Sequence, residues 1–286
     1  MTPHSRKRRH AFSLIELLVV IGIIALLIAV LLPVLGRARI SALELRSQSG
    51  LRQMMIGYIL YAQNNRGSLL FGYTPSTVDG APVSVADPRS GQTFGTPVSQ
   101  RYPWRLLPFV SNIWPIIHSH GDLPAIPAAG ESSSQAFLDA YMLSLNPTYG
   151  INSVYVGGDA NYQGFVGPNN SPNIHHHVVF KSSEVHSSSK LIIFADCRTT
   201  NVPSLAGQGL YCLTPPHASG HNWEVVNNAT HILNPNLIMG VPQGWYSNRI
   251  MVSFFDGHVE SMLPSQLDDM RLWANYATAP DYDYAF

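Results

Sequence analysis

Charged residues are scarce in this chain of 286 residues, where Asp, Glu, Lys and Arg together make up only 12%. The 17 basic and 17 acidic residues balance to a formal net charge of zero. Bulk charge therefore gives no argument for a nucleic-acid partner. The basic residues are unevenly distributed, however, because four of them precede the first acidic residue, Glu16. They form a short basic leader: Arg6, Lys7, Arg8 and Arg9.

Cysteine is almost absent, and neither a C-x-x-C pair nor a Cys/His spacing typical of structural zinc is present. The two cysteines, Cys197 and Cys212, lie 15 residues apart. If this part of the chain is exported, a disulfide between them would close a small loop and stabilise the fold by about 3 kcal/mol. The alternative is a pair of buried free thiols.

The sequence also lacks the short motifs of common enzyme classes: it contains no G-x-S-x-G elbow, P-loop or G-x-G-x-x-G turn. We therefore expect no catalytic activity, no metal and no cofactor. The sequence contains two histidine clusters, His175 to His177 and the segment HSHGD at 118–122. We expect the first to lie on an exposed edge strand and the second in a loop, and neither to bind a metal. The alternative to a chain without a metal is a calcium site formed by Asp196, Asp256 and His258, which all lie in strand-like segments near turns.

A long apolar segment follows the leader. From Leu14 to Leu35 the only charged residue is Glu16. A helix of this length spans about 33 Å, which matches the hydrocarbon core of a bilayer. The segment is too long for an ordinary signal peptide. A plain signal anchor fits the length but does not explain Glu16, because a carboxylate at membrane depth normally has a partner or a function.

The segment AFSLIELLVVIGIIALLIAVLLPVL (11–35) resembles the N-terminal signal of type IV pilins and type II secretion pseudopilins. In that family a prepilin peptidase cleaves after a small residue, and the new N-terminal Phe is methylated. The resemblance implies cleavage between Ala11 and Phe12, with Ala11 in place of the usual Gly. Glu16 and Pro33 then match the fifth and twenty-second residues of the processed family members.

This resemblance implies a role for Glu16. Cleavage would release the amine of Phe12, and an amine is strongly attracted to a carboxylate in a medium of low dielectric. In a filament, Glu16 would pair with the Phe12 amine of a neighbouring subunit, so that its desolvation is offset only after assembly. The alternative is a glutamate that snorkels to the interface. Pro33 removes one helical hydrogen bond and would bend or loosen the helix, or else marks the membrane exit.

Beyond the membrane segment, the apolar spacing predicts that one helix continues to about Gln63. Asn64, Asn65 and Gly67 form a stop pattern. We therefore divide the chain into four regions. They are a leader (1–11), a transmembrane helix (12–36), an amphipathic stem (37–66) and an extracytoplasmic body (67–286).

The body is predicted to be α+β, with an antiparallel sheet packed on the stem. Residues 68–150 are mostly loop, apart from a short aromatic helix or turn at 102–110 and a helix at 134–143. Later segments rich in β-branched and aromatic residues predict strands, with a hairpin at Asp256-Gly257. The predicted strand segments are 153–158, 175–180, 189–197 and 249–263, and a terminal helix is predicted at 264–277.

The C-terminal segment FFDGHVESM (254–262) resembles a bacterial subfamily of prepilin-type proteins with a DGHV hairpin. That subfamily usually has a histidine shortly before the Asp-Gly pair, where this chain has Tyr246.

Together these resemblances predict a non-enzymatic, prepilin-like subunit of a type IV pilus or a type II secretion pseudopilus. It would cross the inner membrane once, with its N-terminus in the cytoplasm and its body in the periplasm or outside the cell. The implied partners are a prepilin peptidase, other pilin-like subunits, an inner-membrane assembly platform and the lipid bilayer. The alternative is a membrane-anchored binding or enzymatic domain that uses a pilin-type signal.

Overall fold

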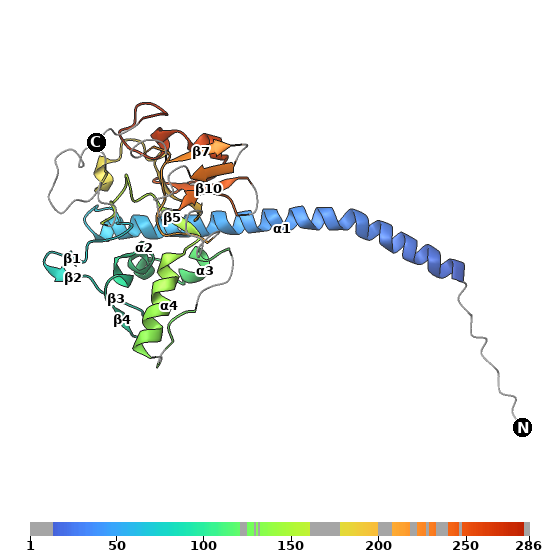
Figure 1. The fold of residues 1–286 in the computed structure, drawn as a ribbon, viewed down its shortest axis with the longest axis horizontal. Coiled ribbons are helices and arrows are strands. Elements are labelled where there is room, and N and C mark those ends of the chain that lie inside the picture. The colour runs from blue at the N-terminus through green and yellow to red at the C-terminus, as the bar shows by residue number, and fades with distance from the viewer. Residues whose placement is uncertain are drawn as a thin grey trace, which may run out of the picture. The chain divides into compact units, whose positions relative to one another are not determined.

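The computed structural model describes most of the chain and contains two compact units, Met1–Leu43 and Glu44–Phe286. The described residues are 14–120, 125–128, 130, 132–160, 178–199, 208–217, 222–226, 229–232, 240–245 and 248–282. The protein is α+β, with a long N-terminal helix followed by a body built around an antiparallel sheet (Figure 1).

Helix α1 runs from Leu14 to Asn64 and confirms the single continuous helix predicted from the sequence. It ends where the sequence predicts, because Arg66 and Gly67 adopt positive φ angles of 55° and 80°. The Gly67 amide donates to the carbonyl of Ala62 over 2.8 Å, which satisfies one of the last helical carbonyls.

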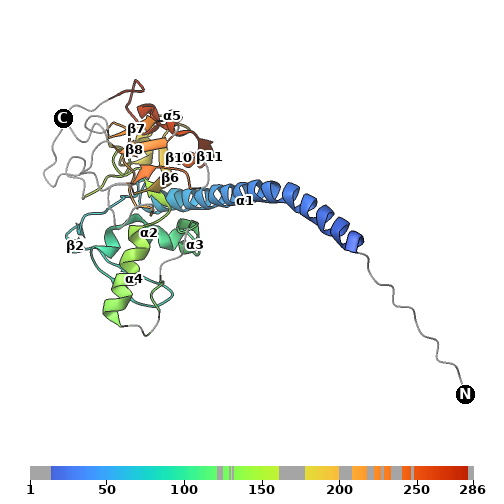
Figure 2. The same cartoon turned by 45° about the vertical axis from the view of Figure 1, so that its right-hand side comes forward.

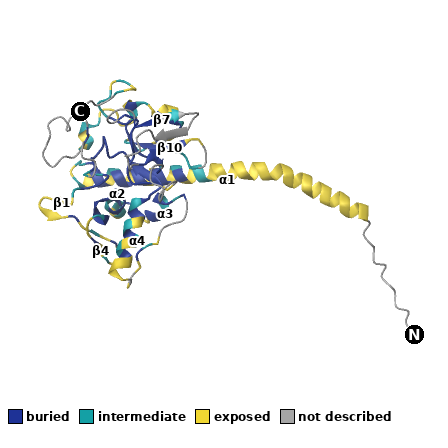
Figure 3. Ribbon diagram, in the orientation of Figure 1, coloured by how far each residue is buried: buried dark blue, intermediate teal, exposed yellow. Residues whose placement is uncertain are grey.

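Within the first unit, α1 is exposed, as its yellow colouring shows in Figure 3, and most of its sequence there is apolar. Leu14 to Leu35 presents large aliphatic side chains in every direction, with Leu14 79% exposed and Leu35 68% exposed. Among the described residues, α1 is the one helix long and apolar enough to cross a membrane. A bilayer is the environment that such a surface suits.

Within the second unit, the C-terminal part of α1 is the stem, and its buried residues recur at helical spacing. The buried set is Ser47, Gly50, Leu51, Met54, Met55, Gly57, Tyr58, Tyr61 and Ala62. The stem lies between two layers, with the sheet on one side and short helices from residues 102–145 on the other (Figures 1 and 2). Tyr58 packs edge-on against Phe194 of the sheet at 5.8 Å, and Tyr61 packs against Phe109 at 5.6 Å.

The sheet has the strand order β11-β10-β6-β5, and β9 also pairs with β6. All of these pairs are antiparallel. Its strands are β5 (Tyr149–Ile151), β6 (Ile192–Arg198), β9 (Val241–Pro242), β10 (Ile250–Phe254) and β11 (Val259–Met262). Strand β6 is central, and its first six residues are all buried. Strands β10 and β11 form the hairpin predicted at Asp256-Gly257, where Gly257 has a φ of 92°.

Short helices form the other layer. They are η1 (Val98–Gln100), α2 (Tyr102–Leu106), η2 (Leu107–Phe109), α3 (Trp114–Ile117) and α4 (Ser133–Leu145). The predictions at 102–110 and 134–143 are confirmed, and the Ser132 hydroxyl caps α4 by accepting from the Gln135 amide. Peripheral elements are β1 (Thr77–Val78), β2 (Ala81–Pro82), β3 (Val85–Ala86), β4 (Thr93–Phe94), η3 (Ser182–Glu184), β7 (Trp223–Val226) and β8 (Ala229–Ile232).

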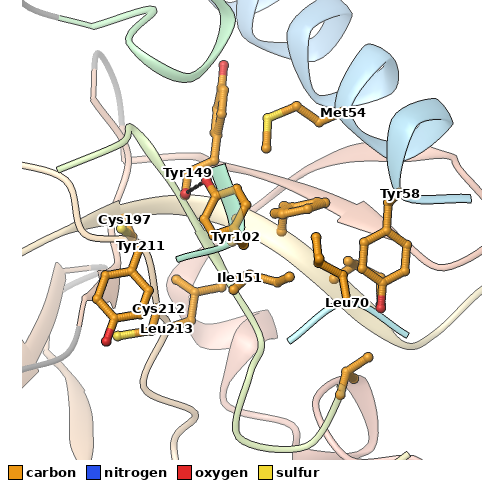
Figure 4. Close-up of a cluster of buried hydrophobic side chains, with 14 of the residues drawn as sticks. Met54, Tyr58, Leu70, Tyr102, Tyr149, Ile151, Cys197, Tyr211, Cys212 and Leu213 are labelled. Carbon is orange, nitrogen blue, oxygen red and sulfur yellow. Dashed lines mark hydrogen bonds between the residues drawn. The ribbon is translucent and has the colours of Figure 1, made fainter. Parts of the chain in front are cut away.

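Gly57 lets the stem approach the helical layer closely. A Cβ atom at this position would lie 2.2 Å from Cγ2 of Val110 and 3.4 Å from the carbonyl oxygen of Phe109. Figure 4 shows the neighbouring part of the core, where Met54 and Tyr58 project from the helix. In the same core the Tyr102 hydroxyl donates to the carbonyl of Tyr149 over 2.6 Å.

One predicted strand is wrong. The strand predicted at 153–158 is instead a turn, because Gly157 and Gly158 have positive φ angles and the Gly157 backbone packs directly on the Leu70 carbonyl. The strand in this region is β5, which lies a few residues earlier. In the segment 175–180, residues 175–177 lie outside the described residues, and Val179 makes a single bridge to Val156.

The terminal helix predicted at 264–277 is broken into α5 (Pro264–Leu267) and the 3-10 helix η5 (Met270–Leu272). The Asp269 carboxylate accepts from the Arg271 amide and so caps a new helix. The Trp273 indole donates to the Leu267 carbonyl over 2.7 Å, which satisfies a helix-terminal acceptor without continuing the helix.

Strand β11 is the last in the sheet order, and side chains bond to its backbone. The Gln48 amide donates to the Val259 carbonyl over 3.4 Å. The Arg249 guanidinium donates to the Ser261 carbonyl and, over 2.7 Å, to the Ser261 hydroxyl. Alternate residues of this edge strand are therefore engaged by side chains of the same molecule.

Candidate functional site

The residues predicted for processing and assembly divide between described and undescribed parts of the chain. The leader residues Arg6 to Arg9 and the junction residues Ala11 and Phe12 lie outside the described residues. Glu16 is described, in the first turn of α1, and is exposed among aliphatic neighbours.

Pro33 lies inside α1, and the helix continues past it for about 30 residues. Proline has no backbone N–H, so the carbonyl of Ala29 loses its usual helical partner. The helix nevertheless continues through Pro33, so the local effect of this residue is to weaken the helix and not to end it.

A second candidate site lies in the body, where four polar side chains meet between the stem and the sheet. His120 Nε2 lies 2.8 Å from Oγ of Ser47 on the stem and 3.8 Å from Oδ1 of Asp196 on β6. The Tyr149 hydroxyl donates to Ser47 Oγ over 3.1 Å and lies 2.9 Å from Oγ of Ser119. Ser47, His120, Tyr149 and Asp196 are all buried. We call these four residues the Ser47 cluster.

The Ser47 cluster does not have the geometry of a Ser-His-Asp catalytic triad. In a triad the serine and the carboxylate contact different nitrogens of the histidine ring, whereas here both approach Nε2 of His120. The adjoining cavity measures about 10 Å³, which is room for about one water molecule. The indole of Trp245 stacks on His120 with ring centres 5.1 Å apart and closes the site further. The arrangement therefore cannot accommodate a substrate.

Burial dominates the electrostatics of the Ser47 cluster. It raises the pKa of Asp196 to about 8, although the Met251 amide donates to the carboxylate over 3.0 Å and partly opposes the shift. It also lowers the pKa of His120 to about 4, and Arg198 and Arg46 add to this effect. Burial likewise raises the pKa of the Tyr149 hydroxyl well above its ordinary value. The environment thus favours the neutral form of each group.

The metal sites considered from the sequence have no support in the described part of the chain. No group of three or more His, Cys, Asp or Glu side chains placed to hold a metal ion occurs there. The Asp196 carboxylate accepts from the Met251 amide near the start of β10. Asp256 lies instead in the turn after that strand, where it contacts Nδ1 of His258 at 2.6 Å. In HSHGD, His118 and His120 are buried loop residues. The last two positions of that segment lie outside the described residues, and so do His175 to His177.

Cys197 and Cys212 are both free and buried, so the disulfide considered from the sequence is not formed. Cys197 Sγ donates to the Leu210 carbonyl over 2.9 Å and accepts from its amide. The Gly240 backbone occupies the space beside this sulfur, since a Cβ there would lie 2.8 Å from it. Burial raises the pKa of Cys197 to about 12, so its thiol stays protonated.

Sequence reasoning missed the Ser47 cluster. Its members are far apart in the chain and lie on different elements, and no short motif connects them. Ser47 lies beside Arg46 in a polar part of the stem sequence, and Tyr149 precedes the strand predicted at 153–158. The one available indication was a pair of histidines, His118 and His120, in an otherwise apolar region.

Residues 6–32 match the protein family described as the prokaryotic N-terminal methylation motif. The match covers the four basic residues of the leader, the predicted cleavage junction, Glu16 and most of the apolar part of α1, and it supports a prepilin-type signal in this chain. No curated protein and no solved structure is significantly similar to the chain.

Proposed function

We propose that this protein is a structural subunit that is cleaved between Ala11 and Phe12, methylated on the Phe12 amine and assembled through α1 into a pilus or a type II secretion pseudopilus. The observation that carries the proposal is the coincidence of the methylation motif at 6–32 with a long, exposed apolar helix. Its role would be assembly, not catalysis, and the cavity beside the Ser47 cluster is too small for a substrate.

Glu16 gives the proposal its mechanism. In an isolated subunit the carboxylate lies among aliphatic side chains at the start of a membrane-spanning helix. An amine about 4 Å away would attract it by about 4 kcal/mol at an effective dielectric constant near 20, before desolvation is subtracted. The Phe12 amine of an adjacent subunit would supply that charge. Pairing of this kind favours assembly in one axial register.

The implied partners follow from this role. They are a prepilin peptidase for cleavage and methylation, other pilin-like subunits for lateral packing, and an inner-membrane assembly platform. The leader would hold the N-terminus in the cytoplasm, and the body would lie in the periplasm or outside the cell. The hairpin β10–β11 carries the DGHV sequence and suggests the prepilin subfamily with that hairpin.

The first test is the mass and N-terminal sequence of the protein recovered from membranes of its native host. A chain that begins with N-methyl-Phe12 is expected. A chain that begins at Met1 would make the apolar helix a plain anchor, and a chain that begins after Leu35 would mean secretion of a free body. Either result would refute the proposal.

The second test concerns Glu16 itself. We expect Glu16→Ala and Glu16→Gln to abolish co-assembly with other pilin-like subunits, measured by cross-linking in membranes and recovery of filaments. Glu16→Asp, which keeps the charge on a shorter side chain, is the matched control and should retain part of the assembly. All three should still insert and be cleaved. Equal assembly of all variants would favour an anchored domain instead.

A further inference from the structure

The Ser47 cluster connects three separate parts of the body. Ser47 belongs to the stem, His120 to the loop after α3, and Asp196 to the central strand β6. Figure 3 shows the stem becoming buried in this part of α1. The contacts at His120 are therefore among those that attach the stem to the sheet. Because the side chains of Ser47, His120 and Asp196 are nearly inaccessible to water, the charge state of the cluster affects how firmly the stem is held.

The Asp196 carboxyl is only partly satisfied. Its Oδ2 accepts from the Met251 amide, whereas Oδ1 accepts no hydrogen bond from the described residues and has His120 Nε2 at 3.8 Å. An ionised carboxylate at this position is costly, because a buried charge needs close hydrogen bonds on both oxygens. A protonated carboxyl removes that cost. Asp196 thus has a structural reason to hold a proton when the stem is docked.

Several charged and titratable groups surround the pair. Glu44 and Arg46 come from the stem, Arg198 from β6, Arg249 from the segment before β10, and Tyr149 from β5. Arg198 favours ionisation of Asp196, and Glu44 opposes it. Neither outweighs burial, which is the largest cause of the shifts at both Asp196 and His120.

We propose that the Ser47 cluster is a proton-dependent latch, in which one proton held on Asp196 keeps the stem docked on the sheet and loss of that proton weakens the attachment. The latch lies wholly within the second compact unit. It is independent of processing and assembly, so its failure and that of the proposed function are distinguishable.

The direction of the pH effect follows from comparing the two states. Asp196 has a pKa of about 8 when folded against an ordinary 3.8, and His120 has a pKa of about 4 against 6.5. Between pH 4 and 6.5 each state of the pair holds one proton, on Asp196 when folded and on His120 when unfolded. The pair then makes stability nearly independent of pH in that range.

Above pH 6.5 the states differ, since the folded pair keeps its proton to about pH 8 while the unfolded pair has lost it. Stability therefore falls as pH rises through this window. The unfolding equilibrium constant should increase by up to about 30-fold between pH 6.5 and 8. The latch thus responds to alkaline conditions, and acidification to about pH 4 leaves the contribution of the pair unchanged.

The test uses the full chain in detergent micelles, unfolded with urea at steps of about half a pH unit from about pH 4 to about pH 8.5. Tryptophan fluorescence reports the body alone, because all five tryptophans follow residue 100. The wild-type protein should lose stability above pH 6.5. Asp196→Asn should abolish that loss, because only His120 then remains, and its contribution is constant above pH 6.5.

Two further variants complete the test. His120→Gln should extend the loss of stability to the whole range from pH 4 to 8, because Asp196 then titrates without compensation. Asp256→Asn is the matched control, since Asp256 lies in the exposed hairpin turn, and it should behave as the wild type above pH 6.5. A wild-type protein with constant stability from pH 6.5 to 8.5, or the same slope in Asp196→Asn, would overturn the proposal.

A direct measurement covers the case in which Asp196→Asn does not fold. Infrared spectra of wild-type protein labelled with ¹³C at aspartate should show a protonated carboxyl band at pH 6.5 that disappears near pH 8. Absence of that band at pH 6.5 would also overturn the proposal.

Discussion

Gly57→Ala is expected to destabilise the body, although alanine is the better helix former. In an unconstrained helix the change would stabilise by about 0.5–1 kcal/mol. At Gly57, however, the new Cβ would lie 2.2 Å from Cγ2 of Val110, whereas carbon atoms pack best at about 3.5–4.0 Å. Overpacking of this size costs about 1–3 kcal/mol. The net loss of unfolding free energy should be about 1–2 kcal/mol, the overpacking term outweighing helix propensity.

The assay is urea unfolding of the full chain in detergent, followed by tryptophan fluorescence. Gly36→Ala is the matched control, because a Cβ at Gly36 would meet nothing within 4 Å, and this change should leave unfolding of the body unaltered. A double-mutant cycle then identifies the cause. Val110→Ala removes the clashing methyl group, so Gly57→Ala should cost less in that background, with a coupling energy of about 1 kcal/mol or more.

The reasoning would be refuted if Gly57→Ala were as stable as the wild type or more stable. That result would mean that the stem does not lie so close to the segment after α2. If Gly57→Ala cost as much in the Val110→Ala background as in the wild type, the clash with Val110 would not be the cause of the loss. The close approach of the stem to this segment would still stand.

Two other predictions concern backbone geometry and thiol chemistry. Gly257→Ala should destabilise the body by about 1–2 kcal/mol in the same unfolding assay, because the hairpin turn holds this residue at a φ of 92°. Gly257→Asn should cost less, because asparagine tolerates a positive φ better than alanine. If the two variants were equally stable, that result would contradict the turn geometry. Cys197 and Cys212 should resist a thiol reagent at pH 8 in the native state and react only after unfolding, since burial raises the pKa of both; rapid labelling of the native protein would contradict their burial.

Local patterns in the sequence predicted the long elements well. The apolar spacing of residues 51–62 is a helical pattern repeated over three turns, so the docked stem could be recognised before its partner surface was known. The hairpin around Asp256-Gly257 was predictable for a similar reason, since a turn pair between two apolar runs specifies strand, turn and strand at once.

Predictions failed where tertiary contacts override local preference. The segment 153–158 is rich in β-branched and aromatic residues, yet the close packing of Gly157 on Leu70 makes it a turn. The amphipathic pattern at 264–277 is interrupted because Asp269 caps a second helix. The Ser47 cluster depends entirely on contacts between distant positions, so no single stretch of sequence could have predicted it.

The side-chain bonds along β11 have a consequence for the behaviour of many copies at high local concentration. An exposed edge strand can pair with the edge of another molecule and so start aggregation. On β11, however, the carbonyls of Val259 and Ser261 already accept from Gln48 and Arg249. A foreign strand would have to displace both side chains before it could add to the sheet. These hydrogen bonds therefore disfavour edge-to-edge pairing of sheets between neighbouring copies. They do not affect association through other surfaces.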